Sequence, residues 1–366
     1  MQRLISHKLR HFILIALFLF VLGALPSYAQ KSPPQILVVG DSLIWGQGLR
    51  EEDKTYSLVK KWFSQNMELD GPVAIKVKAH SGATLTLHED EGSALKKLGL
   101  PETTAFHGEV SFGFPSTSTQ LDMAATEYAN AGVSSGNVKL ILISGCITDI
   151  TVAEILKPTA RDKDLPPLVE RYCLNDMGRV LLKAVTLFPE AKIAVIGYFP
   201  MVSPQSSSAR IFDGWLESKR TPRPLKPVAN NPFTRILLGG IRKRAIERSR
   251  IWKIESDRQL RLAVDQVNSA SGLGRAVFIA SPIDESTAAE TPNTLLFKMG
   301  KGGRTEDSFY DFRMRECRRP YEMIAKSGLR EPVRYCEVSG LGHPNPNGAR
   351  AYADAIIEAM KPRIAR

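Results

Sequence analysis

The sequence of 366 residues lacks several features that define specialised protein classes. It has only four cysteines and no Cys-x-x-Cys pair, which excludes a disulfide-dense scaffold and gives no support to a zinc ribbon. Internal repeats and low-complexity segments are absent as well. Aromatic residues make up only 8% of the chain, but 43% of residues are hydrophobic, which is too many for a disordered protein. These features predict an ordinary globular protein, and no motif in it calls for a metal or another cofactor.

The amino terminus has no hydrophobic run long enough to span a membrane. The apolar segment 12–25 has 14 residues, whereas a spanning helix needs roughly 20. Three basic residues precede this segment, and a small-x-small sequence ending at Ala29 follows it. The pattern predicts a secretory signal peptide over residues 1–29 and a periplasmic or secreted chain after it. An uncleaved anchor is the alternative interpretation.

Acidic residues are fewer than basic ones. The formal net charge is +11, of which residues 1–29 carry +3 and the remainder carries +8. An exported protein rarely meets nucleic acid, so we expect no nucleic-acid partner. Eleven bases between Ser206 and Arg250 instead suggest a guide toward an anionic polymer or membrane surface. A solvated basic loop is the alternative.

Hydrophobic patterning alternates between two kinds of segment. Short apolar runs typical of buried parallel strands occupy residues 36–39, 73–77, 139–143, 192–196 and 276–280. Apolar residues at helical spacing occupy 56–67, 121–131, 168–188, 256–269 and 347–360. Because strands alternate with helices, we expect a five-stranded parallel sheet covered on both faces, which is a three-layer α/β/α sandwich. Two long polar stretches, at about 200–250 and 284–336, are interpreted as insertions in a single domain over residues 30–366.

The candidate site residues follow the predicted strands, because ligands of an open parallel sheet bind beyond the carboxyl ends of its strands. Ser42 follows the first strand on a tight turn, and its hydroxyl becomes a nucleophile only when a base takes its proton. His343 lies in a Gly-His-Pro-Asn sequence that opens the last helix, and it is the candidate base. The backbone N–H groups of Ser42 and Gly82, together with the Thr148 hydroxyl, are candidates for stabilising an oxyanion. These residues predict an acyl-transfer site, although Ser42 in a simple turn or cap is the alternative.

The order of these motifs resembles the SGNH (GDSL) hydrolase family. Gly40-Asp41-Ser42-Leu43 resembles its nucleophile block, and Gly145-Cys146-Ile147-Thr148-Asp149 resembles a Gly-Cys-Ile-Asn-Asp variant of its third block. Gly82 and His343 fall where the family has its oxyanion glycine and its catalytic histidine. The resemblance implies a flavodoxin-like sheet and esterase or lipase chemistry on small esters or on O-acyl groups of carbohydrate or lipid.

The sequence departs from the family pattern at two positions. Thr148 replaces the oxyanion asparagine, which keeps a donor but shortens its reach. Gly340 stands three residues before His343, where the family usually places an aspartate. We expect a backbone carbonyl to orient the histidine instead, with Glu337 and Asp284 as less favoured substitutes. A catalytically weak binding protein on the same scaffold is the alternative function.

The remaining polar and cysteine residues are given structural roles. Asp41 and Asp149 are expected to accept hydrogen bonds from loop N–H groups rather than to act as acids or bases. Four cysteines allow three pairings, among which the sequence alone does not choose. Proximity along the chain and an oxidising compartment favour Cys146–Cys173 and Cys317–Cys336.

Overall fold

Five parallel strands form a single sheet at the centre of the protein. The computed structural model describes residues 33–66, 72–207, 232–272 and 274–364, and the predicted leader over residues 1–29 lies outside them. The strands are β1 (Gln35–Val39), β2 (Ala74–Val77), β3 (Val138–Ile143), β4 (Lys192–Ile196) and β5 (Ala276–Ile279). Their order is β2-β1-β3-β4-β5, and every neighbouring pair is parallel. The continuous apolar runs of β1, β3 and β4 are explained by this order, because interior strands are buried on both faces.

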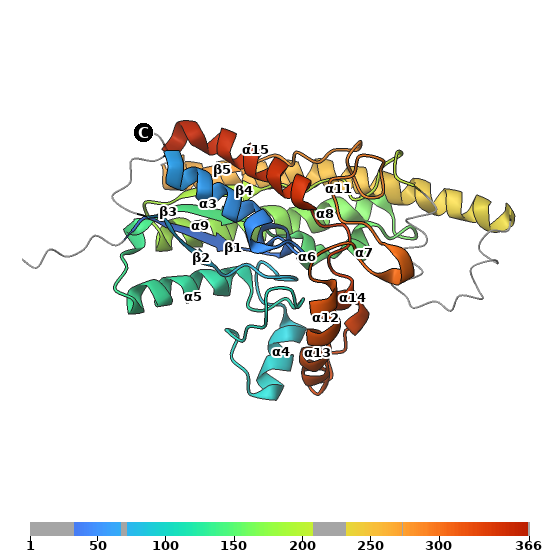
Figure 1. The fold of residues 1–366 in the computed structure, drawn as a ribbon, viewed down its shortest axis with the longest axis horizontal. Coiled ribbons are helices and arrows are strands. Elements are labelled where there is room, and N and C mark those ends of the chain that lie inside the picture. The colour runs from blue at the N-terminus through green and yellow to red at the C-terminus, as the bar shows by residue number, and fades with distance from the viewer. Residues whose placement is uncertain (1–32, 67–71, 208–231, 273, 365–366) are drawn as a thin grey trace, which may run out of the picture. The chain divides into compact units, whose positions relative to one another are not determined.

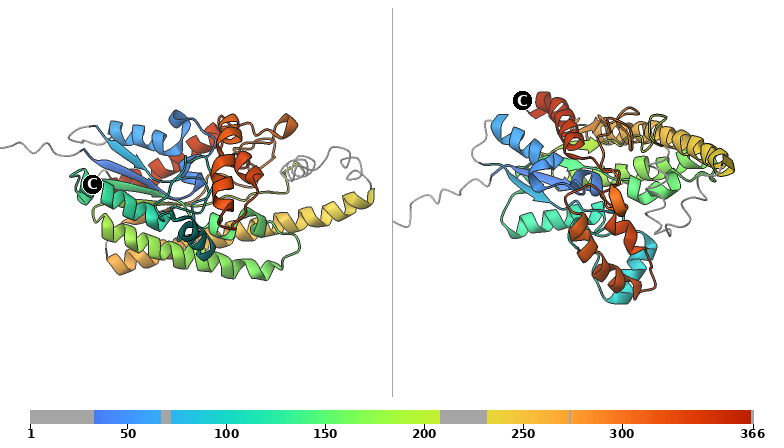
Figure 2. Two further views of the ribbon diagram at one scale, coloured as in Figure 1. Left: turned by 90° about the horizontal axis from the view of Figure 1, so that it is seen from below. Right: turned by 45° about the vertical axis from the view of Figure 1, so that its right-hand side comes forward.

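Helices cover both faces of the sheet (Figure 1). On one face α3 (Thr55–Asn66) packs against α15 (Pro346–Ile364). On the other face α9 (Met177–Leu187) lies between α5 (Thr117–Asn130) and α11 (Pro232–Ser271), as the left-hand view of Figure 2 shows. The expected three-layer α/β/α sandwich with a flavodoxin-like strand order is therefore confirmed.

The winding direction of the sheet reverses between β1 and β3. From β1 the chain crosses to β2 on one side, and from β2 it returns past β1 to β3 on the other. Such a switch point leaves a crevice at the carboxyl ends of the two strands, where ligands of this architecture bind. Two short helices begin there: α2 (Ser42–Trp45) follows β1, and α6 (Ile147–Ile150) follows β3.

The first predicted insertion includes part of a long helix. The helix expected over 256–269 begins at Pro232, so residues 232–250 extend the core helix α11 and are not a loop. The hydrophobic faces of its later turns anchor it, with Trp252 and Leu260 fully buried. Residues 208–231 of the same predicted insertion lie outside the described residues.

The second predicted insertion contains three short helices, α12 (Tyr310–Glu316), α13 (Arg318–Ala325) and α14 (Val333–Glu337). With α4 (Glu89–Leu98), which the pattern did not reveal, they enclose a second apolar cluster. Its buried members are Leu95, Val110, Phe112, Phe114, Cys317, Tyr321, Ile324 and Cys336. The helix expected over 168–188 also differs in detail, since it consists of α8 (Leu165–Val169), a π-helical segment (Glu170–Asp176) and α9.

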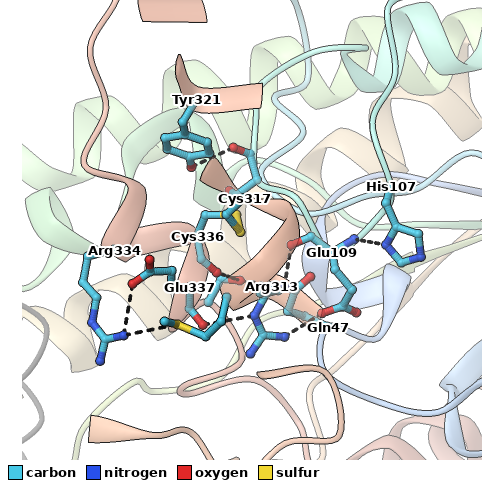
Figure 3. Close-up of a disulfide and its surroundings, with 12 residues drawn as sticks. Gln47, His107, Glu109, Arg313, Cys317, Tyr321, Arg334, Cys336 and Glu337 are labelled. Carbon is cyan, nitrogen blue, oxygen red and sulfur yellow. Dashed lines mark hydrogen bonds and ion pairs between the residues drawn. A yellow bond between two sulfur atoms is a disulfide. The ribbon is translucent and has the colours of Figure 1, made fainter. Parts of the chain in front are cut away.

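Both disulfides pair as expected. Cys146 bonds to Cys173 with an S–S distance of 2.06 Å, and Cys317 bonds to Cys336 at 2.01 Å. The first joins the segment after β3 to the π-helical segment, and the second joins the start of α13 to α14 (Figure 3). Among the described helices, none combines the length and the apolar character needed to cross a membrane.

Candidate active site

Ser42 lies at the first position of α2, directly after β1. Gly40 has a φ of +126°, and a Cβ added there would lie 2.1 Å from the Ser144 carbonyl oxygen. Only glycine therefore lets the end of β1 approach the segment after β3 this closely. Asp41 then caps α2 by accepting a 3.0 Å hydrogen bond from the Leu43 N–H.

Asp41 is a fully buried acceptor, as the sequence predicted. Its carboxylate accepts hydrogen bonds from the Ser144 hydroxyl at 2.6 Å and from the Tyr198 hydroxyl. Burial raises its pKa, while these hydrogen bonds act in the opposite direction. Sequence reasoning missed Tyr198, because this residue reaches Asp41 from the loop after β4. Hydrogen bonds among Asp41, Ser144 and Tyr198 therefore hold the turn on which Ser42 lies.

His343 meets Ser42 from the other end of the chain. Its Nε2 atom lies 2.7 Å from the Ser42 Oγ atom, across 301 positions of sequence. The segment is fixed by a backbone hydrogen bond of 2.8 Å from the Phe297 N–H to the His343 carbonyl. Asn345 then accepts from the N–H groups of Asn347 and Gly348 and so begins α15. The Gly-His-Pro-Asn sequence therefore holds the ring at a helix start, beside the nucleophile.

The His343 ring is held in its neutral form. Burial lowers its pKa to about 4, and the nearby positive charge of Arg313 lowers it as well. The carbonyl groups of Ser339 and Leu341 and the charge of Asp307 act in the opposite direction. At neutral pH the imidazole is therefore uncharged and able to accept the Ser42 proton.

The other ring nitrogen of His343, Nδ1, has no carboxylate partner among the described residues. Nδ1 of His343 is buried, and among the described residues no group meets it with hydrogen-bond geometry. The Glu337 carboxylate pairs with Arg334 at 3.2 Å, and the Asp284 carboxylate accepts from the exposed Ser286. Neither side chain that the sequence offered as a substitute hydrogen-bonds to His343 in the described part of the chain.

Gly82 lies on the loop after β2, which is joined to the nucleophile turn by a hydrogen bond of 3.2 Å from the His80 N–H to the Gly40 carbonyl. Gly82 has a φ of +83°, and a Cβ there would lie 2.5 Å from the Ser111 Oγ atom. Among the described residues, neither the Gly82 N–H nor the Ser42 N–H has a hydrogen-bond acceptor within the protein.

The segment after β3 clamps the Gly82 loop. The Asp149 carboxylate accepts the Leu85 N–H at 3.1 Å, which is the structural role that the sequence predicted for it. The Thr148 hydroxyl donates its hydrogen to the Ala83 carbonyl at 2.5 Å. In this arrangement Thr148 braces the loop, and its one hydroxyl hydrogen is already used. Cys146 opens this segment with a φ of +99°, which is costly for a residue other than glycine and is held in place beside the disulfide.

The basic stretch is less exposed than its sequence indicates. Arg248 is buried and donates hydrogen bonds of 2.9 Å to the carbonyls of Ile155, Arg161 and Glu154. It is therefore a structural residue of α11 rather than part of a charged surface. Lys243 and Arg244 are exposed at the amino-terminal part of the same helix, which extends beyond the carboxyl ends of the strands in Figure 1.

Fold and site together define an open parallel α/β protein with a serine–histidine pair at its switch point. Among the described residues, no group of His, Cys, Asp and Glu side chains is arranged to hold a metal ion.

Comparisons with known proteins give structural neighbours only. No protein-family model matches the chain, and no curated protein gives a significant match. Among solved structures, it is similar to phospholipase A1 from Streptomyces albidoflavus NA297 (11% identity, 90% of this chain and 100% of the other, TM-score 0.42). It is also similar to an extracellular lipase from Streptomyces rimosus (12% identity, 89% and 99%, TM-score 0.40). A third neighbour is a family two carbohydrate esterase from Clostridium thermocellum in complex with cellohexaose (10% identity, 90% and 64%, TM-score 0.36).

Proposed function

We propose that the protein is an exported serine ester hydrolase of the SGNH type, with Ser42 as the nucleophile and His343 as the general base. The observation that carries the proposal is the 2.7 Å contact between Ser42 Oγ and His343 Nε2 at the carboxyl edge of the sheet. A neutral imidazole at this distance is what activation of a serine hydroxyl requires.

The site residues account for each step of ester hydrolysis. His343 Nε2 takes the Ser42 proton while Oγ attacks the ester carbonyl, and the carbonyl oxygen becomes an oxyanion. The N–H groups of Ser42 and Gly82 stabilise that oxyanion. His343 then gives the proton to the leaving alcohol, which leaves an acyl group on Ser42. Water, deprotonated by the same ring, attacks this acyl-enzyme. As the acyl–oxygen bond breaks, His343 returns that proton to Ser42 Oγ, and the acid is released.

The histidine is oriented by backbone carbonyl groups in this proposal. The carbonyl groups of Ser339 and Leu341 raise the pKa of the ring and so favour its protonated form, although neither accepts from Nδ1 with hydrogen-bond geometry in the described structure. A carbonyl can hold Nδ1–H toward itself and so direct the unprotonated Nε2 to Ser42. The protein would then work with a serine–histidine pair and no triad carboxylate in direct contact with the ring.

The proposed substrate class rests on the site residues, and the proposed compartment rests on the disulfides. We propose O-acyl groups on carbohydrate or lipid as substrates, and Lys243 and Arg244 as part of a guide toward anionic surfaces. Two formed disulfides agree with an oxidising compartment. We therefore propose export by a leader over residues 1–29 and a single domain over residues 30–366.

Labelling with a fluorophosphonate tests the proposal. The wild-type protein should be labelled on Ser42, while the Ser42→Ala variant should not be labelled although it unfolds at a similar temperature. The His343→Ala variant should be labelled much more slowly, because its serine has no base. A folded wild-type protein that is not labelled would indicate the alternative, a binding protein on the same scaffold.

A further inference from the structure

Asp307 fills the space that a side chain three residues before His343 would occupy. That position is Gly340, and a Cβ added there would lie 2.3 Å from the Asp307 Oδ2 atom and 2.8 Å from the Arg313 Nη2 atom. On its other side Asp307 presses against Gly48, where an added Cβ would lie 2.7 Å from the Asp307 Cβ atom. The carboxylate is therefore wedged between the turn that follows Ser42 and the segment that leads to His343.

Arg313 holds this carboxylate and a second one. Its guanidinium donates to Asp307 Oδ2 at 2.7 Å and to Glu109 Oε2 at 2.6 Å, and all three side chains are shielded from solvent (Figure 3 shows the Glu109 side). Its Nε atom also donates to the Glu337 carbonyl at 3.3 Å. A buried charge needs such pairing, because an unpaired one is strongly destabilising. Arg313 is thus the centre of a buried cluster, Glu109–Arg313–Asp307.

The cluster connects the segments that carry the site. Glu109 accepts hydrogen bonds from the Trp45 indole at 3.0 Å and from the Gly48 N–H at 3.1 Å. Trp45 and Gly48 lie three and six residues after Ser42. Gln47 from the same turn donates to the Ser339 hydroxyl at 2.6 Å, four residues before His343. The Glu109–Arg313–Asp307 cluster therefore binds the Ser42 side of the site to the His343 side.

We propose that Asp307 and Arg313 are positioning residues for His343, which lock residues 337–343 onto the turn after Ser42 and so maintain the serine–histidine hydrogen bond. The inference rests on the proposed hydrolase function. It assigns the role of the absent carboxylate at Gly340 to two residues of the second insertion, which act through the backbone and through their charges instead of by contact with the ring.

The two residues act on the ring with opposite sign. The positive charge of Arg313 lowers the pKa of His343, and the negative charge of Asp307 raises it. Around them, Glu109 faces Arg313, Lys54 lies with its ammonium 3.1 Å from the centre of the Trp45 ring, and Glu337 pairs with Arg334. A change at either positioning residue should therefore displace the ring and shift its pKa. The pKa should rise when Arg313 is neutralised and fall when Asp307 is neutralised.

The test compares Arg313→Gln and Asp307→Asn with the wild-type protein. Rates on a small neutral ester are normalised to the fraction of Ser42 that a fluorophosphonate labels at completion, so that unfolded protein is not counted. Both variants should lose on the order of 10²-fold in kcat, as a displaced catalytic group does, with KM nearly unchanged. Titration of the His343 ring, followed by NMR of its Cε1–H, should move to higher pH in Arg313→Gln and to lower pH in Asp307→Asn.

Arg248→Gln is the matched control, because it removes a different buried arginine whose hydrogen bonds go to residues 154–161. It should lower stability and leave the normalised kcat and the ring titration unchanged. If Arg313→Gln does not fold, Arg313→Lys replaces it, since one ammonium cannot hold both carboxylates in the same geometry.

Normalised rates within about three-fold of wild type and an unshifted titration in both variants would overturn the positioning role. The titration separates this outcome from failure of the hydrolase proposal. A wild-type protein that resists labelling would refute the hydrolase, while opposite shifts in the two variants would still place the cluster behind the His343 ring.

Discussion

The Thr148 hydroxyl donates its hydrogen to the Ala83 carbonyl oxygen at 2.5 Å, next to Gly82, the proposed oxyanion donor. Threonine has one hydroxyl hydrogen, whereas the asparagine amide has two N–H hydrogens. We therefore expect Thr148→Asn to keep the bond to Ala83 and to add a donor toward the substrate.

The Thr148→Asn variant should raise kcat by about 10-fold, because one oxyanion donor is worth on the order of 10²–10³ when ideally placed. Thr148→Val, which loses the brace, should lower kcat. Steady-state kinetics on one small ester decide the matter, and a lower kcat in Thr148→Asn would show that the threonine hydroxyl is itself the better oxyanion donor.

The pH dependence of activity should follow the neutral His343 ring. With a pKa lowered to about 4, the base is deprotonated above that pH, so activity should rise through about pH 4 and stay level toward neutrality. From the sequence alone, a histidine with its ordinary pKa would be assumed, and activity would then be expected to rise near pH 6.5. A profile of kcat/KM over pH 3.5 to 8 measures this; a midpoint near 6.5 would mean that the ring is hydrated rather than buried.

Removal of either alternative carboxylate should leave catalysis largely intact. Asp284→Asn alters an exposed turn, and Glu337→Gln weakens a pair with Arg334, but neither removes a bond to His343. Each variant should keep kcat within about three-fold, whereas His343→Ala should lose at least the 10²–10⁴-fold typical of a general base. A loss at either acid comparable to that of His343→Ala would identify it as the triad member.

The Cys146–Cys173 disulfide should matter for both stability and rate. It closes a loop of 27 residues, and its removal in a Cys146→Ala/Cys173→Ala variant should cost about 3–4 kcal/mol of unfolding free energy. Cys146 also begins the segment that clamps the Gly82 loop, so kcat per labelled serine should fall. Removal of Cys317–Cys336, which closes 19 residues, is the comparison, and denaturant unfolding measures both.

The exposed bases of α11 should guide anionic substrates. Lys243→Glu with Arg244→Glu should weaken hydrolysis of an anionic acylated polymer at low salt, because the attraction is screened beyond about 8–10 Å at ordinary ionic strength. A small neutral ester should be hydrolysed at an unchanged rate. Equal effects on both substrates, or none on either at any salt concentration, would reject the guide role. The bases would then be solvated residues of a helix surface.

Much of the scaffold could be predicted because the pattern that forms it is local. The four apolar residues after Gln35 are a buried strand whatever lies beside them, and the order of strands and helices then places Ser42 and Gly82 at one edge of the sheet. The Cys146–Cys173 disulfide could be predicted for a similar reason, because the two cysteines are only 27 positions apart in the sequence.

The rest depends on contacts that no local pattern contains. Residues 239–250 begin with two glycines and contain many basic residues, so their sequence does not indicate the helix that begins at Pro232. Arg313 resembles any other arginine in a polar stretch until folding buries it between Glu109 and Asp307. The sequence predicts Thr148 as an oxyanion donor, but only the three-dimensional structure shows that Ala83 receives its hydrogen.

The chain separations around the site imply an order of assembly. The two disulfides close loops of 27 and 19 residues, whereas the contact between Ser42 and His343 closes 301 positions. Entropy opposes closure more strongly as the loop lengthens. We therefore expect the disulfide loops to close first. The proposed nucleophile then gains its base only when α15 docks beside α3.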